Sequence, residues 1–113
     1  MLRAQRLRQR QEFARVYRRG RPYRSELLIM RALRTNEPLS RFGFTVSRAV
    51  GNAVTRNRVR RRMREAIGSL RIAPGWDLVF NSRVNIAQAS YAQIREAIRI
   101  LLERAELLEE TAS

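Results

Sequence analysis

The sequence predicts an α/β (α+β) fold, a two-layer sandwich whose elements follow the order α-β-β-α-β-α. Two observations support this prediction. Short apolar runs of strand length alternate with segments in which apolar residues recur every three or four positions. The chain also has the length of one small domain, with 113 residues of which 44% are hydrophobic. We therefore expect a single domain over residues 1–113.

The chain begins with a predicted helix and a predicted strand. The segment from Arg10 to Tyr17 is interpreted as a short helix because three side chains share one helical face: Phe13, Val16 and Tyr17. Gly20 and Pro22 then end this helix. The run "ELLIMRAL", from Glu26 to Leu33, is short, apolar and bounded by turn formers, which is typical of a strand.

A second strand is predicted from Arg41 to Ser47, after a turn over "RTNEPLS". Its side chains alternate between two faces. One face is apolar and consists of Phe42, Phe44 and Val46; the other is small and polar and consists of Gly43, Thr45 and Ser47. Such a strand is half-buried.

The next predicted element is a helix that is both amphipathic and strongly basic, within the stretch "VGNAVTRNRVRRRMREAI" from Val50 to Ile67. Asn52 or Thr55 can serve as its N-cap. A stripe in a sector of roughly 100° predicts the side that packs on the core; it consists of Val59, Met63, Ala66, Ile67 and Leu70. The other faces carry six arginines within nine residues: Arg56, Arg58, Arg60, Arg61, Arg62 and Arg64.

The last part of the chain predicts one more strand and one more helix. Pro74–Gly75 marks a turn, and the short apolar run from Asp77 to Arg83 follows as a strand. Ser90 and Gln93 have the spacing of a capping box at the start of a helix. Its apolar stripe, which we expect to lie on the sheet, consists of Ile94, Ala97, Ile98, Leu101, Ala105 and Leu108.

The charge of the chain is large and unevenly distributed. The net charge is +14, all basic residues are arginine, and residues 1–64 hold 19 arginines against 3 glutamates. Residues 65–113 hold 5 arginines against 7 acids, so the second half is close to neutral. This asymmetry predicts a polyanionic partner, with nucleic acid favoured over an anionic membrane.

The residues that most protein nucleases need are absent. The chain has no cysteine and no histidine, which excludes disulfides, thiolate nucleophiles, imidazole bases and ordinary zinc sites. Asp77 is the only aspartate. The late glutamates are interpreted as a solvated face of the last helix: Glu103, Glu106, Glu109 and Glu110. We therefore expect no catalytic residue and no bound metal in the protein alone.

Membrane insertion and secretion are not predicted. No apolar run approaches the roughly 18 residues of a membrane span, and the N-terminus lacks the apolar centre of a signal peptide. We expect a cytoplasmic protein.

The arginines of the central helix lack partners in their own segment, where Glu65 is the only acid. Like charges at i,i+4 oppose helix formation by about 0.2–0.5 kcal/mol per pair, so we expect an external anion to compensate them. The free N–H groups of the first turn can bind phosphate, and Asn57 can contact a base edge or a 2′-hydroxyl. Arginine on every free face suits a folded RNA better than a DNA groove.

These residues resemble the RNR motif of the bacterial ribonuclease P protein family. Arg56-Asn57-Arg58 stands as the triplet, after Gly51-Asn52-Ala53-Val54 and before Arg60-Arg61, Arg64, Glu65 and Ala66. The strand from Arg41 to Ser47 is similar to the family's strand before the motif. The family's N-terminal helix and turn are matched by Leu7, Phe13, Val16, Tyr17 and Gly20. The resemblance covers nearly the whole chain in the same order.

The resemblance implies a protein component of ribonuclease P, in which an RNA removes the 5′ leader of precursor tRNA by metal-assisted hydrolysis. It implies binding of the catalytic RNA by Arg56, Asn57, Arg58, Arg60, Arg61 and Arg64. It implies binding of the leader, in a cleft between the first helix and the open sheet face, by Phe13, Tyr17, Thr45, Ser47 and Arg48. Mg²⁺ would act in the holoenzyme, and no protein partner is implied. The implied sheet is mixed, with a left-handed βαβ crossover where the general rule favours a right-handed one.

Two positions depart from the family pattern, and three alternatives stay open. Ala49 stands where a second basic residue is usual, and Arg31 stands where an aromatic residue is common. Phe13 can stack on a base or simply pack on the sheet. The function can instead be that of a ribosomal-type structural RNA-binding protein or of a basic DNA-compacting protein.

Overall fold

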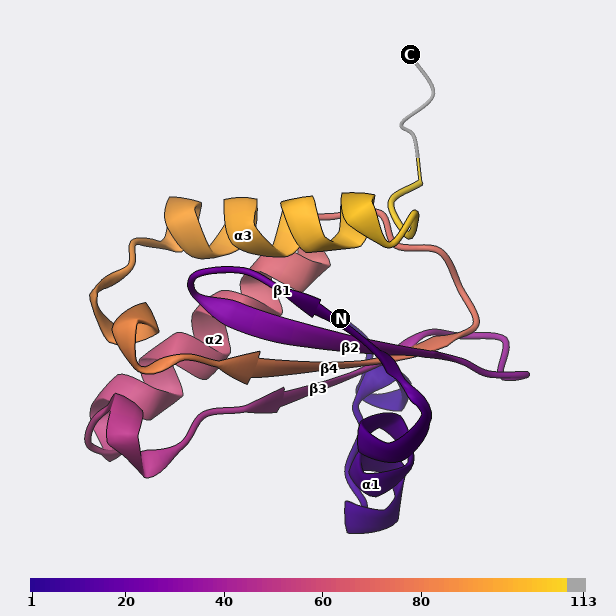
Figure 1. Ribbon diagram of the computed structural model, residues 1–113, viewed down its shortest axis with the longest axis horizontal. Helices are drawn as coiled ribbons and strands as arrows, with labels where there is room; N and C mark the ends of the chain where they lie inside the picture. The colour runs from indigo at the N-terminus through magenta and orange to yellow at the C-terminus, as the bar shows by residue number, and fades with distance from the viewer. Residues whose placement is uncertain (110–113) are drawn as a thin grey trace.

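The structure is a computed structural model that describes residues 1–109 of the chain. It contains a four-stranded mixed sheet in the order β1-β2-β4-β3 (Figure 1). The strands are β1 (Arg21–Arg24), β2 (Leu28–Arg34), β3 (Arg41–Thr45) and β4 (Trp76–Ser82). The main helices are α1 (Arg10–Arg19), α2 (Ala53–Gly68) and α3 (Tyr91–Arg104).

The sheet separates one large core from one small core. α2 and α3 cover one face, while α1 lies against the other face (Figure 1). β3 and β4 are parallel neighbours joined through α2, and the β1–β2 and β2–β4 pairs are antiparallel. The predicted α/β (α+β) fold class is confirmed, and the crossover that the resemblance implies to be left-handed is the β3–α2–β4 unit.

The predicted core stripe of α2 is confirmed, and the predicted stripe of α3 is confirmed as far as Leu101. Leu70 of the α2 stripe is half-buried. The other four residues of the stripe are buried against the sheet: Val59, Met63, Ala66 and Ile67. Asn52 is the N-cap of α2, because its Oδ1 accepts a hydrogen bond from the Thr55 N–H at 2.9 Å. Ser90 and Gln93 form the predicted capping box of α3.

The sequence prediction missed β1, so the predicted order of elements lacked one strand. The β1 sequence "RPYR" shows no alternation, and three of its four residues are exposed. β1 lies at the edge of the sheet and pairs only with β2. An edge strand tolerates Pro22, which lacks an N–H, and such a strand depends on its neighbour more than on its own sequence.

The ends of several elements also differ from the predictions. α1 continues to Arg19, β2 begins at Leu28, and β4 begins at Trp76 and ends at Ser82. β3 ends at Thr45 because the chain turns into the 3₁₀ helix η2 (Arg48–Val50), whose first bond joins the Val50 N–H to the Ser47 carbonyl.

α3 ends at Arg104, so the prediction that its stripe continues through Ala105 and Leu108 was wrong. Glu106 has φ 60°, and the Leu107 N–H bonds to the Leu102 carbonyl, which is the pattern of a Schellman cap. Leu108 then forms an isolated antiparallel bridge with Ile72. Glu106 and Glu109 therefore do not lie on the helix as predicted, and Glu110 lies outside the described residues.

Gly43 in β3 allows α1 to pack closely on the sheet. A Cβ at this position would lie 2.5 Å from Phe13 Cε1. Phe13 is half-buried and packs with a small cluster formed by Leu7, Val16, Leu33 and Val79. The glycine therefore leaves space for the ring that holds α1 in place.

We expect Gly43→Ala to destabilise the protein by about 1–3 kcal/mol, because the added methyl group overpacks the Phe13 contact. Gly68→Ala is the matched control, since a Cβ there meets only the Met1 nitrogen, at 3.8 Å. Alanine is the better helix former by up to about 1 kcal/mol, so the control should be neutral or stabilising. Urea unfolding of both variants measures the difference, and equal midpoints would contradict the close packing at Gly43.

Candidate RNA interface

The arginines of α2 have no acidic partners among the residues that the structure describes. Within residues 1–109, salt bridges form only at Arg41 and Arg99. Arg99 on α3 pairs with Glu96 at 2.6 Å and with Glu103 at 2.7 Å. These hydrogen bonds raise the pKa of Arg99, so its charge is compensated inside the helix. The charge of α2 is uncompensated and available to an external anion.

Two arginines of α2 also have a structural contact. Arg58 Nη2 donates to the Ala87 carbonyl at 3.1 Å, and Arg62 Nη1 donates to the Ala89 carbonyl at 3.0 Å. They hold the segment around the 3₁₀ helix η3 (Val84–Gln88) against α2. Arg61 is exposed and has no such contact within residues 1–109. Among the predicted RNA-binding residues, Arg58 is therefore the one that holds a distant segment of the chain against α2.

A hollow of about 520 Å³, which we call the basic basin, lies between α2, β3 and the N-terminal segment. Five arginines and three phenylalanines are among its lining residues: Arg3, Arg6, Arg8, Arg60, Arg64, Phe13, Phe42 and Phe44. The N-terminal segment lies along β3, because the Leu7 N–H donates to the Phe42 carbonyl at 2.9 Å. The basin thus combines converging cations with aromatic surface, a combination suited to nucleic acid.

Arg64 shows how strongly the charges in the basin repel. Burial lowers the pKa of Arg64, and the neighbouring charges of Arg6 and Arg60 lower it further. Its Nε is buried and has no hydrogen-bond partner within residues 1–109. Arg60 Nη1 donates to Asn57 Oδ1 at 3.0 Å, so the motif asparagine supports an arginine of the basin. A phosphate bound here would relieve this repulsion.

The sequence prediction missed the contribution of the N-terminal segment to this site. Arg6 approaches Arg64 only because the backbone of Arg6 forms an isolated parallel bridge with Phe42 on β3. The only signal in the sequence is the charge of "MLRAQRLRQR", which does not say where the segment lies.

Of the predicted leader residues, Tyr17 and Thr45 come together on the open sheet face. Tyr17 is 42% exposed, and its Oη accepts a hydrogen bond from Asn81 Nδ2 at 2.6 Å. Thr45 Oγ1 accepts from the same nitrogen. The guanidinium of Arg31 lies 5.1 Å from the centre of the Tyr17 ring. Asn81 and Arg31 were not among the predicted site residues.

The other predicted leader residues occupy different places. Phe13 packs on the sheet, and it also lines the basic basin. Ser47 and Arg48 are exposed beyond the end of β3, at the start of η2. Within residues 1–109 no side-chain hydrogen bond joins either of them to α1, so the structure does not bring them into the group around Tyr17.

Arg41 fixes α1 to the sheet. Its Nη1 donates to Glu12 Oε2 at 2.6 Å, and its Nε and Nη2 donate to the two carboxylate oxygens of Asp77 at 2.9 and 2.8 Å. The Asp77 side chain is 1% exposed. Burial opposes ionisation of Glu12, but the N–H groups of Gln9 and Arg8 and the charge of Arg41 outweigh it and lower the pKa of Glu12. This ion-paired group sets the position of α1 beside the open face.

Comparison with known proteins identifies the family. The family model described as Ribonuclease P matches residues 1–106. The chain belongs to the ribonuclease P protein family. The ribonuclease P protein component of Dehalococcoides mccartyi (strain CBDB1) is 40% identical over 111 residues, which cover 98% of this chain and 92% of that protein.

Solved structures of RNase P proteins share the fold. A Staphylococcus aureus RNase P protein mutant with defective mRNA degradation activity superposes with a TM-score of 0.86 at 25% identity, over 93% of this chain and 91% of that one. The RNase P protein from Thermotoga maritima gives a TM-score of 0.77 at 28% identity, over 88% and 96% of the two chains. The predicted family is therefore confirmed, and the chain is a protein component of RNase P.

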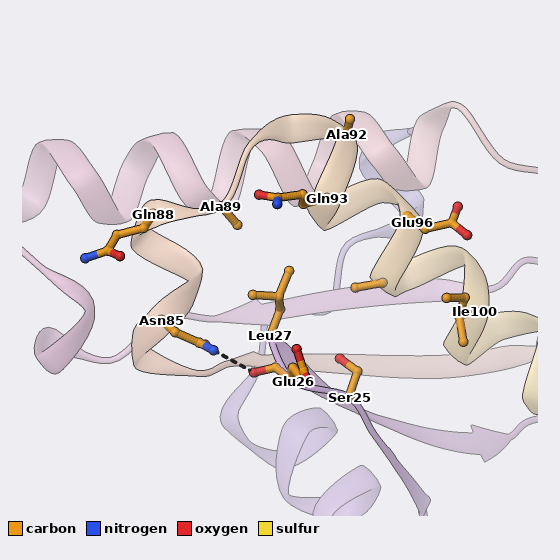
Figure 2. A pocket seen from close by; sticks show the side chains of 11 residues that line it. Ser25, Glu26, Leu27, Asn85, Gln88, Ala89, Ala92, Gln93, Glu96 and Ile100 are labelled. Atoms are coloured by element: carbon orange, nitrogen blue, oxygen red, sulfur yellow. Dashed lines mark hydrogen bonds between the residues drawn. The ribbon is translucent and has the colours of Figure 1, made fainter.

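A larger hollow in this RNase P protein lies away from the arginines of α2. It is a groove of about 610 Å³ between α3, the β1–β2 turn and η3 (Figure 2). Leu27, Ala92 and Ile100 contribute apolar surface, and Glu26 and Glu96 contribute carboxylates. Those carboxylates oppose the binding of phosphate, so this groove suits a polyanion less well than the basic basin and α2 do.

Within residues 1–109, no helix of this RNase P protein is both long enough and apolar enough to cross a bilayer.

Proposed function

We propose that this RNase P protein binds the catalytic RNA through α2 and the basic basin, and binds the 5′ leader of precursor tRNA across the open sheet face beside α1. It thereby assists the endonucleolytic removal of the leader, which the RNA catalyses. The observation that carries the proposal is the contrast between two helices. The arginine at the centre of α3 is paired with two glutamates, whereas the six arginines of α2 have no acidic partner in the described part of the chain.

The contribution of α2 is to neutralise phosphates of the folded catalytic RNA. The planar guanidinium groups of Arg60, Arg61 and Arg64 can each pair with two phosphate oxygens. Each phosphate contact releases condensed counterions, which makes binding favourable and sensitive to salt. Neutralisation by protein also lowers the Mg²⁺ concentration at which the RNA folds and acts, because fewer cations are then required.

The contribution of the open face is to hold an unpaired strand. Tyr17 offers an exposed ring, and Arg31, Thr45 and Asn81 surround it with polar groups. Single-stranded nucleic acid is commonly held by aromatic rings beside cationic groups. Ser47 and Arg48 are exposed beyond the end of β3, where they would contact another part of the leader.

Mg²⁺ is implied by the family resemblance, and the carboxylates within residues 1–109 do not gather into a site for it. Magnesium is bound through oxygen ligands such as free carboxylates, but Glu12 and Asp77 are held by Arg41, and Glu96 and Glu103 by Arg99. Within residues 1–109 no three residues of metal-binding type gather. We therefore assign no reaction step to a protein carboxylate. We also propose a cytoplasmic location, where precursor tRNA is processed.

A cleavage assay tests the proposal. Precursor tRNA and the matching catalytic RNA are incubated over a Mg²⁺ titration with and without the protein, and we expect the protein to restore cleavage at low Mg²⁺. Equal cleavage with and without it would favour the ribosomal-type alternative. Tight binding to random duplex DNA at physiological salt would favour the DNA-compacting alternative.

A further inference from the structure

A hydrogen-bond network on the open sheet face is centred on Asn81, one of the polar groups around Tyr17. Arg31 Nη1 donates to Asn81 Oδ1 at 2.8 Å. Asn81 Nδ2 donates to Tyr17 Oη at 2.6 Å and also to Thr45 Oγ1. One amide therefore joins β2, β4, β3 and α1 at the place where the leader is proposed to lie.

The orientation of this amide follows from the chemistry of its neighbours. A guanidinium group only donates hydrogen bonds, so the atom that faces Arg31 is the amide oxygen. The NH₂ group must then face the two hydroxyls, and each of its hydrogens is used by one of them. Tyr17 and Thr45 act as acceptors toward Asn81.

A hydroxyl that accepts a hydrogen bond still has its own hydrogen to donate. Within residues 1–109 neither the Tyr17 hydroxyl nor the Thr45 hydroxyl donates to a protein acceptor. Arg31 adds further N–H groups, and its stacking on the Tyr17 ring keeps the guanidinium beside that hydroxyl. The exposed side of the network therefore presents hydrogen-bond donors.

A surface that presents these donors beside a guanidinium favours a ligand that accepts hydrogen bonds and carries negative charge. Phosphodiester oxygens accept and carry negative charge, whereas most base edges combine donors with acceptors. We propose that Asn81 is a positioning residue that turns the Tyr17 and Thr45 hydroxyls outward, and that these hydroxyls with Arg31 bind one phosphate of the leader. This inference rests on the proposed binding of the leader to this face.

Asn81→Asp tests the inference with almost no change of shape. A carboxylate only accepts, so both hydroxyls must donate inward to it and lose the hydrogens that they offered to the leader. Arg31 keeps its partner. We expect the assembled holoenzyme to bind precursor tRNA at least about tenfold more weakly, since the loss of two hydrogen bonds to a charged group has at least this effect. Its affinity for mature tRNA, which has no leader, should be unchanged.

Two further measurements show whether Asn81→Asp acts by turning the hydroxyls inward. They exclude a general disturbance of the structure and a simple effect of the added negative charge. Tyr17→Phe should weaken precursor binding in the wild-type background and have no further effect in Asn81→Asp, because the hydroxyl is already turned inward. In a second experiment, neutral methylphosphonate linkages replace the leader phosphates one at a time. One position should lower the affinity of the wild-type holoenzyme for precursor tRNA and have no effect on the Asn81→Asp holoenzyme. Additive losses, or a linkage effect that persists in Asn81→Asp, would overturn the inference.

The remaining outcomes are also decisive. Wild-type affinity for precursor tRNA in Asn81→Asp would overturn the role of Asn81 and leave the proposed function standing. A wild-type holoenzyme with no preference for precursor over mature tRNA would overturn both. If Asn81→Asp does not fold, the double variant Tyr17→Phe/Thr45→Val removes the same two donors. It should lose at least about tenfold in precursor affinity, and an unchanged affinity would overturn the inference.

Discussion

Replacing Arg60 and Arg64 together with alanine should weaken binding of the catalytic RNA by about 100-fold or more at physiological salt. Both side chains line the basic basin, where burial and the charge of Arg6 make an anion most favourable. A hydrogen bond to a charged group contributes about 1.5–3 kcal/mol, so two lost phosphate contacts account for this magnitude. The salt dependence should also become shallower by roughly one counterion for each lost contact.

The matched control for this variant removes the same charge from the neighbouring helix α3. Arg99→Ala/Arg104→Ala on α3 lowers the net charge equally, but Arg99 is paired with two glutamates and Arg104 donates to the Arg24 carbonyl. Filter binding at several salt concentrations should show affinity and slope close to wild type for this control. Equal losses in both double variants would mean that net charge, and not the basin, determines the binding.

The largest effect on stability is expected at Arg41. Arg41→Ala leaves the carboxylate of Asp77, whose side chain is 1% exposed, without a cation. A buried charge that loses its partner costs about 3–5 kcal/mol. Asp77→Ala should cost less, about 1–3 kcal/mol, because the Arg41 side chain is 20% exposed and keeps Glu12 as a partner.

Urea unfolding of the two variants measures this asymmetry. The predicted order is wild type, then Asp77→Ala, then Arg41→Ala as the least stable. Glu12→Gln serves as the control for the exposed side of the group, and its effect should be the smallest of the three. If Asp77→Ala is the least stable variant, the ion-paired group does not hold α1 in the way the geometry indicates.

The elements that the sequence predicts well are those whose signal is local. The stripe on α2, with Met63 and Ile67 in its centre, depends only on helical spacing, and both residues are buried. The strand β1 has no comparable signal, since its pairing with β2 exists only in the folded chain. The end of α3 was predicted too far along the chain. Leu108 is half-buried although it lies after the Schellman cap, so the apolar spacing continues beyond the last helical residue.

The same distinction applies to the candidate site. The arginines of α2 were predicted because their density along the chain is itself the signal. Arg6 was missed, since it reaches Arg64 only by the path of the N-terminal segment along β3. Arg31 and Asn81 were missed as site residues because their contact joins two strands fifty residues apart in sequence. Contacts between residues so far apart in the sequence cannot be predicted from the spacing of residues along the chain.

The claim that α2 lies among the backbones of the catalytic RNA can be tested by placing a chemical probe on the helix. The chain has no cysteine, so one introduced cysteine is a unique attachment point for an iron chelate that cleaves nearby RNA. Val54 suits this purpose, because it lies in the first turn of α2 and its side chain is 74% exposed. Glu103→Cys on α3 is the control position.

Mapping the cuts in the assembled holoenzyme gives the answer. We expect the probe at Val54→Cys to cut the catalytic RNA at a few defined backbone positions, and the probe at Glu103→Cys to leave that RNA largely intact. Cuts of equal strength from both positions, or cuts from Glu103→Cys alone, would contradict the assignment of α2 as the surface that docks on the RNA.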